Sequence, residues 1–160
     1  SEEARVGNKN RSYSLPYHLK KEIRKRLGVN VYGVDVGSLQ KAVVALLLDK
    51  NMKIATAESC TAGMLSSRLT EVTGVSAVFE CGISAYSPEI KHKVLGVPME
   101  MIEKFGTVSP EVAGAMATGA RRVGNASLGV GITGVAGPDT SEASLWARYI
   151  SPSLTKKGYG

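Results

Sequence analysis

Short apolar strands alternate with amphipathic helices through the middle of the chain, and this alternation limits the fold more than any other feature. Strand-like segments at residues 53–57, 77–86 and 128–133 are separated by helical segments, the first of them at residues 61–72. Such an alternation builds a sheet covered by helices, because each helix must bury its apolar side. The sequence therefore predicts an α/β fold in three layers, α/β/α, with a mostly parallel sheet.

Two Ser-Pro-Glu tripeptides, at residues 87–89 and 109–111, mark the starts of two helices. Serine caps a helix, proline fits the first helical position, and glutamate complements the positive end of the helix dipole. The helix after the second tripeptide is rich in alanine and glycine, which suits close packing in a core. In the strand at 128–133, Gly129 and Gly131 would let another backbone or a ligand approach.

Side-chain alternation in the strand at residues 77–86 assigns its two faces. Tyr86 shares one face with Glu80 and Ser84, and so points away from the face expected to be core. The apolar side chains that share the core face are Ala77, Phe79, Cys81, Ile83 and Ala85.

Most of the net charge of +6 belongs to an N-terminal arm. Residues 1–30 carry eight basic and three acidic side chains, whereas residues 31–138 carry nine of each. A short basic helix is expected at residues 17–27, since Leu19, Ile23 and Leu27 recur at intervals of four. The arm lacks interleaved aromatics and any known nucleic-acid module, so nucleic-acid binding is not expected.

The composition is typical of a globular domain, with 43% hydrophobic and 21% charged residues. No apolar run approaches the length of a membrane span, which predicts a cytoplasmic protein without a membrane partner. Cys60 and Cys81, and the histidines His18 and His92, are too few and too scattered for a disulfide framework or a metal site. Neither a metal nor a cofactor is expected.

Candidate chemistry lies in three segments that directly follow strands, at residues 56–63, 86–91 and 133–138. In open α/β sheets, ligands bind beyond the carboxyl ends of parallel strands, where loops lead to helix N-termini with unpaired N–H groups. The fold could therefore bring together three segments that span much of the sequence.

Ser59 is the candidate nucleophile, because N–H groups at the start of the following helix could hold an oxyanion. A purely structural alternative is that Ser59 or Thr61 only caps that helix. Cys60 is a weaker candidate, since a lone cysteine is more often a small buried hydrophobe.

The sequence offers two candidate bases for Ser59, namely Lys91 and His92. A lysine in a dry site with a lowered pKa can accept the proton of a serine hydroxyl. Adjacent helical residues point about 100° apart, so Lys91 and His92 cannot both face one pocket. Alone, Lys91 would more simply be an exposed lysine, and His92 a solvent-exposed histidine.

Four motifs taken in order carry a family resemblance: TAESCTAG, SAYSPEIKHKVLGVP, GTVSPEV and GITGVAGP. Together they closely resemble the C-terminal domain of the CinA (competence/damage-inducible) family, whose members include nicotinamide mononucleotide amidohydrolases. The resemblance runs over residues 38–138, and EIRKRLGVNVYG is similar to the connector that precedes this domain in longer members.

The resemblance implies metal-free deamidation of nicotinamide mononucleotide to nicotinate mononucleotide and ammonia. It implies that Ser59 is the nucleophile, that Lys91 is its general base, and that the Tyr86 hydroxyl positions or relays the proton. The partner would be this small nucleotide, and family members are commonly homo-oligomeric, for which the alanine-rich helix could pack across a two-fold axis. The implied substrate-binding positions are Thr61, Gly63, Thr133, Gly134 and Gly137.

The resemblance stops after Pro138, where the family continues into a further strand and an active-site arginine. We expect residues 1–37 to form a basic arm, residues 38–138 the α/β domain, and residues 139–160 a divergent tail. The sheet would then lack its terminal strand and leave an unpaired edge. The tail contains apolar residues that could fold back on this edge, and a disordered tail is an equal alternative. The alternative function is a non-catalytic nucleotide-binding or assembly remnant.

Overall fold

The computed structural model describes residues 16–28, 31, 33, 37–135 and 145–150, and the chain divides into two units at Ala42 and Val43. The first unit contains the helix α1 (Tyr17–Leu27), as its apolar spacing predicts. None of its residues is buried, and Arg26 pairs with Glu22 one turn earlier at 2.9 Å. Among the described residues, no helix is both long and apolar enough to cross a membrane.

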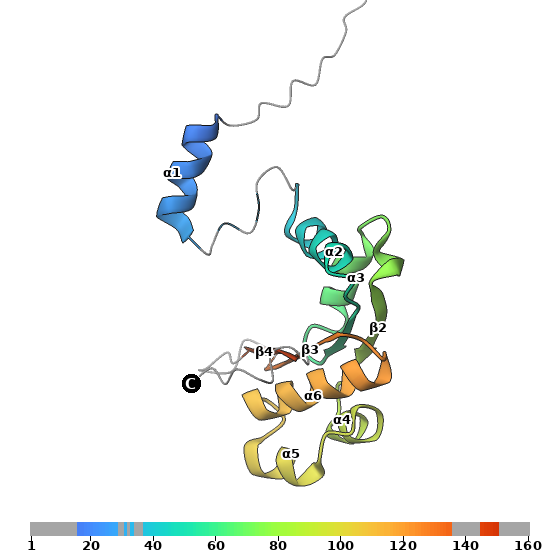
Figure 1. Ribbon diagram of the computed structural model, residues 1–160. Coiled ribbons are helices and arrows are strands. Elements are labelled where there is room, and N and C mark those ends of the chain that lie inside the picture. Colours follow the sequence, from blue (N-terminus) through green and yellow to red (C-terminus); the bar gives the residue numbers. More distant parts are fainter. Residues whose placement is uncertain (1–15, 29–30, 32, 34–36, 136–144, 151–160) are drawn as a thin grey trace, which may run out of the picture. The chain divides into compact units, whose positions relative to one another are not determined.

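The second unit is built on a sheet of four strands in the order β2-β1-β3-β4. The central strand β1 (Ile54–Glu58) pairs in parallel with β2 (Phe79–Ser84) and with β3 (Leu128–Gly134). The strand β4 (Leu145–Ile150) pairs with β3 in the antiparallel direction (Figure 1). The predicted α/β fold with a mostly parallel sheet is thus confirmed.

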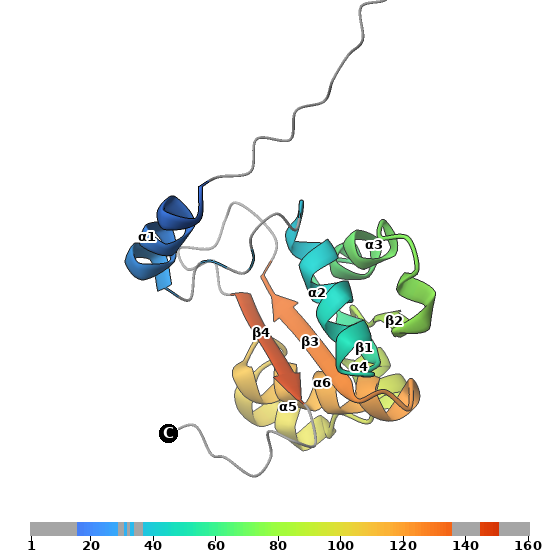
Figure 2. The same ribbon diagram turned by 45° about the horizontal axis from the view of Figure 1, so that its top comes forward.

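The edge of β3 is paired, contrary to the expectation of an uncovered edge. Residues 145–150 lie in the segment expected to be a divergent tail, yet Thr133 pairs with Trp146 and Gly129 with Ile150 (Figure 2). Antiparallel pairing needs only alternating backbone hydrogen bonds, so a segment without family-like residues can supply it. The boundaries predicted at residues 38 and 138 stay predictions.

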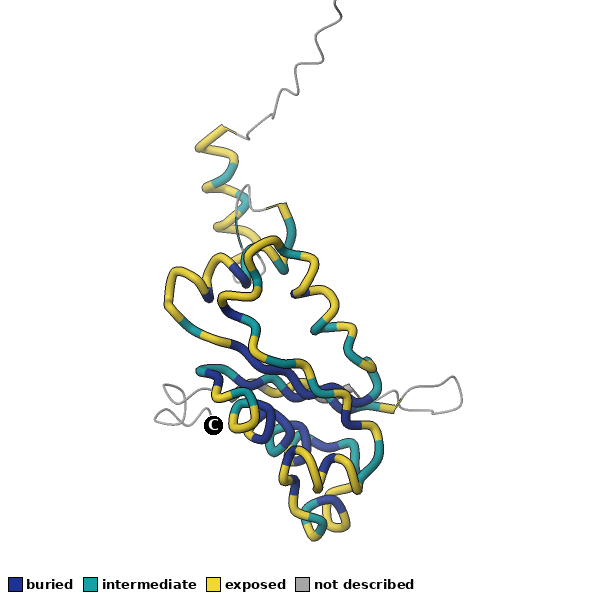
Figure 3. The backbone as a smooth tube through the Cα atoms, turned by 90° about the vertical axis from the view of Figure 1, so that its right-hand side faces the viewer, coloured by how far each residue is buried: buried dark blue, intermediate teal, exposed yellow. Residues whose placement is uncertain are grey.

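Helices cover both faces of the sheet and complete the three layers (Figure 1). One face is covered by α2 (Leu39–Asp49) and α3 (Met64–Thr70), and the other by α4 (Pro88–Leu95), α5 (Met99–Phe105) and α6 (Pro110–Val123). Burial concentrates along β1, at alternate residues of β3, and on one side of α6 (Figure 3). The helix expected at 61–72 is shorter, and α5, a helix of seven residues, was not predicted.

Both Ser-Pro-Glu tripeptides begin helices, as the sequence predicts. The hydroxyl of Ser87 accepts from the N–H of Ile90 at the start of α4, and the hydroxyl of Ser109 accepts from the N–H of Val112 at the start of α6. Each proline occupies the beginning of its helix.

The alanine and glycine positions allow α6 to pack directly on β3. A Cβ on Gly129 would clash with the carbonyl oxygen of Ala117, and one on Gly131 with that of Ala113. The side chains of Ala113, Ala117 and Ala120 are fully buried within the chain. This face of α6 is therefore not available for packing across a two-fold axis, and self-association, still a prediction, needs another surface.

An irregularity in β2 changes the faces predicted for that strand. Ile54 pairs with Phe79 and Ala55 with Cys81, so Glu80 has no partner in β1. Phe79 consequently packs in the core beside α2 and α3, whereas Cys81 and Ile83 pack in the core beside α6. The prediction that all three share one face was wrong, because an extra residue in a strand reverses the alternation.

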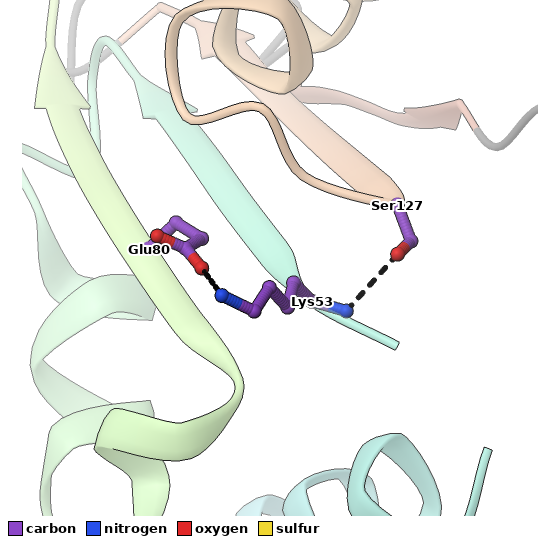
Figure 4. Close-up of polar contacts among 3 residues, drawn as sticks. All are labelled: Lys53, Glu80 and Ser127. Atoms are coloured by element: carbon purple, nitrogen blue, oxygen red, sulfur yellow. Dashed lines mark hydrogen bonds and ion pairs between the residues drawn. The ribbon is translucent and has the colours of Figure 1, made fainter. Parts of the chain in front are cut away.

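Lys53 joins the three parallel strands at their amino ends, away from the candidate site. Its ammonium group forms an ion pair with Glu80 of β2, and its backbone N–H donates to the hydroxyl of Ser127 just before β3 at 3.2 Å (Figure 4). These contacts fix the register of β1 at the end opposite to Ser59.

Candidate active site

A pocket of about 260 Å³ lies at the carboxyl ends of the parallel strands, where the sequence predicts a site. It brings together Ser59, which follows β1, Tyr86 and Lys91 from beyond β2, and Thr133 from the end of β3. All three predicted strand-end segments therefore contribute to one site. The other lining residues are Thr107, Val108, Gly134 and Val135.

Lys91 is buried, with 1% of its surface exposed, so the alternative of an exposed lysine was wrong. Its Nζ donates to Ser59 Oγ at 3.0 Å and to the carbonyl of Tyr86 at 2.6 Å. Burial lowers the pKa of Lys91, and the nearby Cys60 opposes this shift. A buried lysine without a hydrogen-bonded carboxylate is more easily deprotonated, and is therefore suited to act as a base.

His92 faces away from Lys91, as adjacent helical positions require. It is exposed, and its Nδ1 lies 2.8 Å from the carbonyl oxygen of Val97, which is not among the residues that line the pocket. Of the two candidate bases, Lys91 is the one that contacts Ser59.

Ser59 does not cap α3, because the capping position is Gly63 and receives no side-chain bond. The Ser59 residue is 6% exposed, and its backbone N–H donates to the carbonyl of Ile132 in β3 at 3.0 Å. Its carbonyl accepts from the N–H of Ala62, which closes a tight turn between β1 and α3. The hydroxyl is thereby left to contact Lys91.

Glu58 is a functional candidate that our reading of the sequence missed. Its carboxylate is fully buried and accepts hydrogen bonds from the hydroxyls of Thr61 and Ser66 and from the N–H groups of Leu65 and Ser66. The N–H groups of Leu65 and Ser66, at the start of the helix that follows Ser59, are therefore occupied and not free to hold an oxyanion. A signal existed in the sequence, since Gly63 at the start of α3 supplies no capping side chain.

Thr61 and Gly63 shape the turn after Ser59 rather than line the pocket. The Thr61 hydroxyl donates to Glu58 at 2.7 Å, and Gly63 has a positive φ of 99°. Neither residue lines the pocket, and their role in substrate binding stays a prediction.

Tyr86 and Thr133 both line the pocket, but they differ in exposure. Tyr86 is 72% exposed, and its contact with Lys91 is made by its carbonyl oxygen. Thr133 is buried, and its hydroxyl donates to the carbonyl of Thr107 at 2.8 Å. Gly134 also lines the pocket, whereas Gly137 lies outside the described residues.

The model of the CinA C-terminal domain matches residues 36–145. The chain belongs to the CinA family. It is 44% identical to a CinA-like protein of Dictyoglomus turgidum, over 92% of this chain and 36% of that protein. It is 46% identical to a CinA-like protein of Kosmotoga olearia, over 84% of this chain and 33% of that protein.

Solved CinA structures share the fold. A competence/damage-inducible protein from Agrobacterium tumefaciens is 31% identical, with a TM-score of 0.69 over 77% of this chain and 78% of that one. The family match extends past Pro138 to Leu145, the first residue of β4. This CinA chain spans about a third of the length of the curated relatives it matches.

Proposed function

We propose that this CinA domain is a hydrolase that converts nicotinamide mononucleotide to nicotinate mononucleotide and ammonia. The observation that carries the proposal is the distance of 3.0 Å between Lys91 Nζ and Ser59 Oγ in a buried position. Burial lowers the pKa of Lys91, which increases the neutral share of its amine. The substrate is the one implied by the likeness to CinA amidohydrolases, so the family membership supports that part.

The pair suits acyl transfer through a covalent intermediate. The neutral amine of Lys91 accepts the Ser59 hydroxyl proton while Oγ attacks the carboxamide carbon. The protonated amine then gives this proton to the departing nitrogen as the C–N bond breaks, which releases ammonia. Water hydrolyses the resulting ester by the same route, with Lys91 first taking a proton from water and then returning it to Ser59 Oγ.

The surrounding contacts support this assignment of roles. The Tyr86 carbonyl accepts one hydrogen of Lys91, and the lone pair of the neutral amine can then face Ser59. Thr133 lines the same pocket and would contact the substrate near the reacting group. We propose that the Tyr86 hydroxyl, at the rim of the pocket, positions the substrate or relays a proton.

The test is ammonia release from the mononucleotide by the parent chain and by two variants with matched controls. Ser59→Ala and Lys91→Met should each lower kcat/KM on the order of a thousandfold or more. Ser67→Ala on α3 and Lys93→Met on α4 change the same residue types at exposed positions and should retain activity. A parent that releases no ammonia overturns the proposal, and calorimetric binding without turnover would favour a nucleotide-binding module.

The pH profile tests the role of Lys91 separately. The base must be neutral, so kcat/KM should rise with pH through the pKa of Lys91 and level off above it. Burial places this rise below the usual lysine value of 10.5. A profile that is flat from about pH 6 to about pH 10 would contradict proton transfer to Lys91.

A further inference from the structure

Glu58 directly precedes the proposed nucleophile, and its carboxylate reaches across the turn that carries Ser59. We propose that Glu58 is a positioning residue that fixes the place of the Ser59 hydroxyl relative to Lys91. The inference rests on the proposed function for the role of Ser59. It concerns how the chain holds that nucleophile beyond the hydrogen bonds that Ser59 itself makes.

The carboxylate of Glu58 is bound on both oxygens. Oε2 accepts from the Thr61 hydroxyl at 2.7 Å and from the Leu65 N–H at 2.9 Å. Oε1 accepts from the N–H of Ser66 at 2.9 Å and from its hydroxyl at 2.7 Å. Four donors satisfy the full acceptor capacity of an ionised carboxylate, so the side chain is held in one orientation.

These bonds span the turn, from the last residue of β1 to the helix α3. Ser59, Cys60, Thr61, Ala62 and Gly63 lie between the end of β1 and the start of α3. Of the residues that donate to Glu58, Thr61 lies within the turn, whereas Leu65 and Ser66 lie in α3. Any shift of α3 along its axis would therefore stretch the bonds to Glu58 and move the turn with it.

The turn also contains a backbone conformation that needs support. Ala62 has a φ of 51°, in the left-handed region that residues with a Cβ rarely occupy, and Gly63 follows with a φ of 99°. Such a conformation persists where surrounding bonds over-determine it. Glu58 supplies those bonds from one side, and the N–H of Ser59 is held by Ile132 from the other.

The decisive variant is Glu58→Gln, which preserves size and removes the second acceptor oxygen. An amide NH₂ in place of one oxygen would face a backbone N–H, which cannot accept, and a hydroxyl, which can reverse and accept, so at least one of the four bonds must break. The control is Leu69→Val, which weakens the packing of the same helix at a buried apolar position and leaves the four donors of Glu58 in place. Ser66→Ala is a milder variant that keeps the carboxylate and removes one donor.

Two readouts separate positioning from stability and from the identity of the substrate. The first is the rate at which a fluorophosphonate modifies Ser59, followed by intact-protein mass: Oγ bonds to phosphorus, fluoride leaves, and Lys91 takes the proton. The second is the split of kcat and KM for ammonia release. Thermal melting reports in parallel whether each variant is folded.

We expect Glu58→Gln to lower both the labelling rate and kcat by on the order of tenfold to a hundredfold, as displacement of a reacting group does. KM should stay within about threefold, and Leu69→Val should label within about twofold of the parent despite a lower melting temperature. If Glu58→Gln does not fold, Ser66→Ala should show the same loss to a smaller degree.

A folded Glu58→Gln variant that labels at the parental rate would overturn the inference. A loss of labelling in Leu69→Val equal to that in Glu58→Gln would overturn it as well. Where Ser66→Ala replaces an unfolded Glu58→Gln, labelling of Ser66→Ala at the parental rate has the same consequence. A parent whose Ser59 does not react overturns it too. A parent that labels at Ser59 but releases no ammonia would overturn only the proposed substrate, because the effect of Glu58 is then measured on labelling alone.

Discussion

The helices α6 and α3 begin in different ways, although each follows a connection at the same end of the sheet. At α6 the cap is local: the Ser109 hydroxyl accepts from the N–H of Val112, three residues on. At α3 the capping position is Gly63, which has no side chain, and the first N–H groups reach back to Glu58 at the end of β1.

A local cap stabilises its own helix, whereas a cap supplied by the preceding strand also fixes the turn between that strand and the helix. For α3, the residues in between include Ser59, so the start of the helix and the place of the hydroxyl become one structural unit. The group that accepts the N–H bonds differs as well, because it is a charged carboxylate at α3 and a neutral hydroxyl at α6. The turn that carries the nucleophile is therefore the more costly one to disturb.

The largest loss of stability should come from removing the Glu58 carboxylate, which caps α3 from the preceding strand. Glu58→Ala leaves two N–H groups and two hydroxyls without their acceptor in a buried position, and we expect a loss of about 3 kcal/mol in the free energy of unfolding. Urea denaturation monitored by circular dichroism measures this loss. A cost no larger than that of removing a serine cap would show that α3 does not depend on Glu58.

The second-largest effect should be a dependence of stability on pH, which we expect for the Glu58 cap of α3 but not for the serine cap of α6. Burial raises the pKa of Glu58, but the hydrogen bonds from Ser66, Leu65 and Thr61 outweigh it and leave the pKa below its usual value of 4.5. The ionised carboxylate thus stabilises the folded state above that usual value, and this stabilisation disappears as the pH falls through the lowered pKa. A serine cap makes no such contribution.

The measurement compares the parent with Glu58→Gln from about pH 7 to about pH 3. The parent should lose more stability on acidification, so that the difference between the two chains narrows as the pH falls. A constant difference across the range would mean that Glu58 does not titrate with folding.

The two helix starts also show what the sequence could predict. Ser-Pro-Glu is a local signal, so the beginnings of α4 and α6 could be identified, and strand ends led to Ser59, Lys91 and Thr133. Gly63 signals only that α3 lacks a local cap, and it does not point to Glu58, because two of the partners of Glu58 come seven and eight residues later and depend on how α3 docks. The strand β4 was missed for the same kind of reason, since its pairing with β3 is set by the sheet rather than by its own residues.

The smallest losses of stability should come from removing the serine caps, and we expect the buried cap to cost more than the exposed one. Ser109 is buried, and its hydroxyl both accepts from Val112 and donates to the carbonyl of Gly106. Ser38 caps α2 with one solvent-exposed bond, from the N–H of Lys41 at 3.3 Å, and the residue itself is half-buried. Water can replace the lost bond at Ser38 but not at Ser109.

We therefore expect Ser109→Ala to cost about 1 kcal/mol and Ser38→Ala about 0.5 kcal/mol in the free energy of unfolding. Urea denaturation of both variants checks the order, with Ser67→Ala as a control for the loss of an exposed serine hydroxyl within a helix. Equal costs at Ser38 and Ser109 would mean that burial does not set the strength of a local cap in this chain. The larger loss at Glu58 would then have to come from its charge and its four bonds rather than from its buried position.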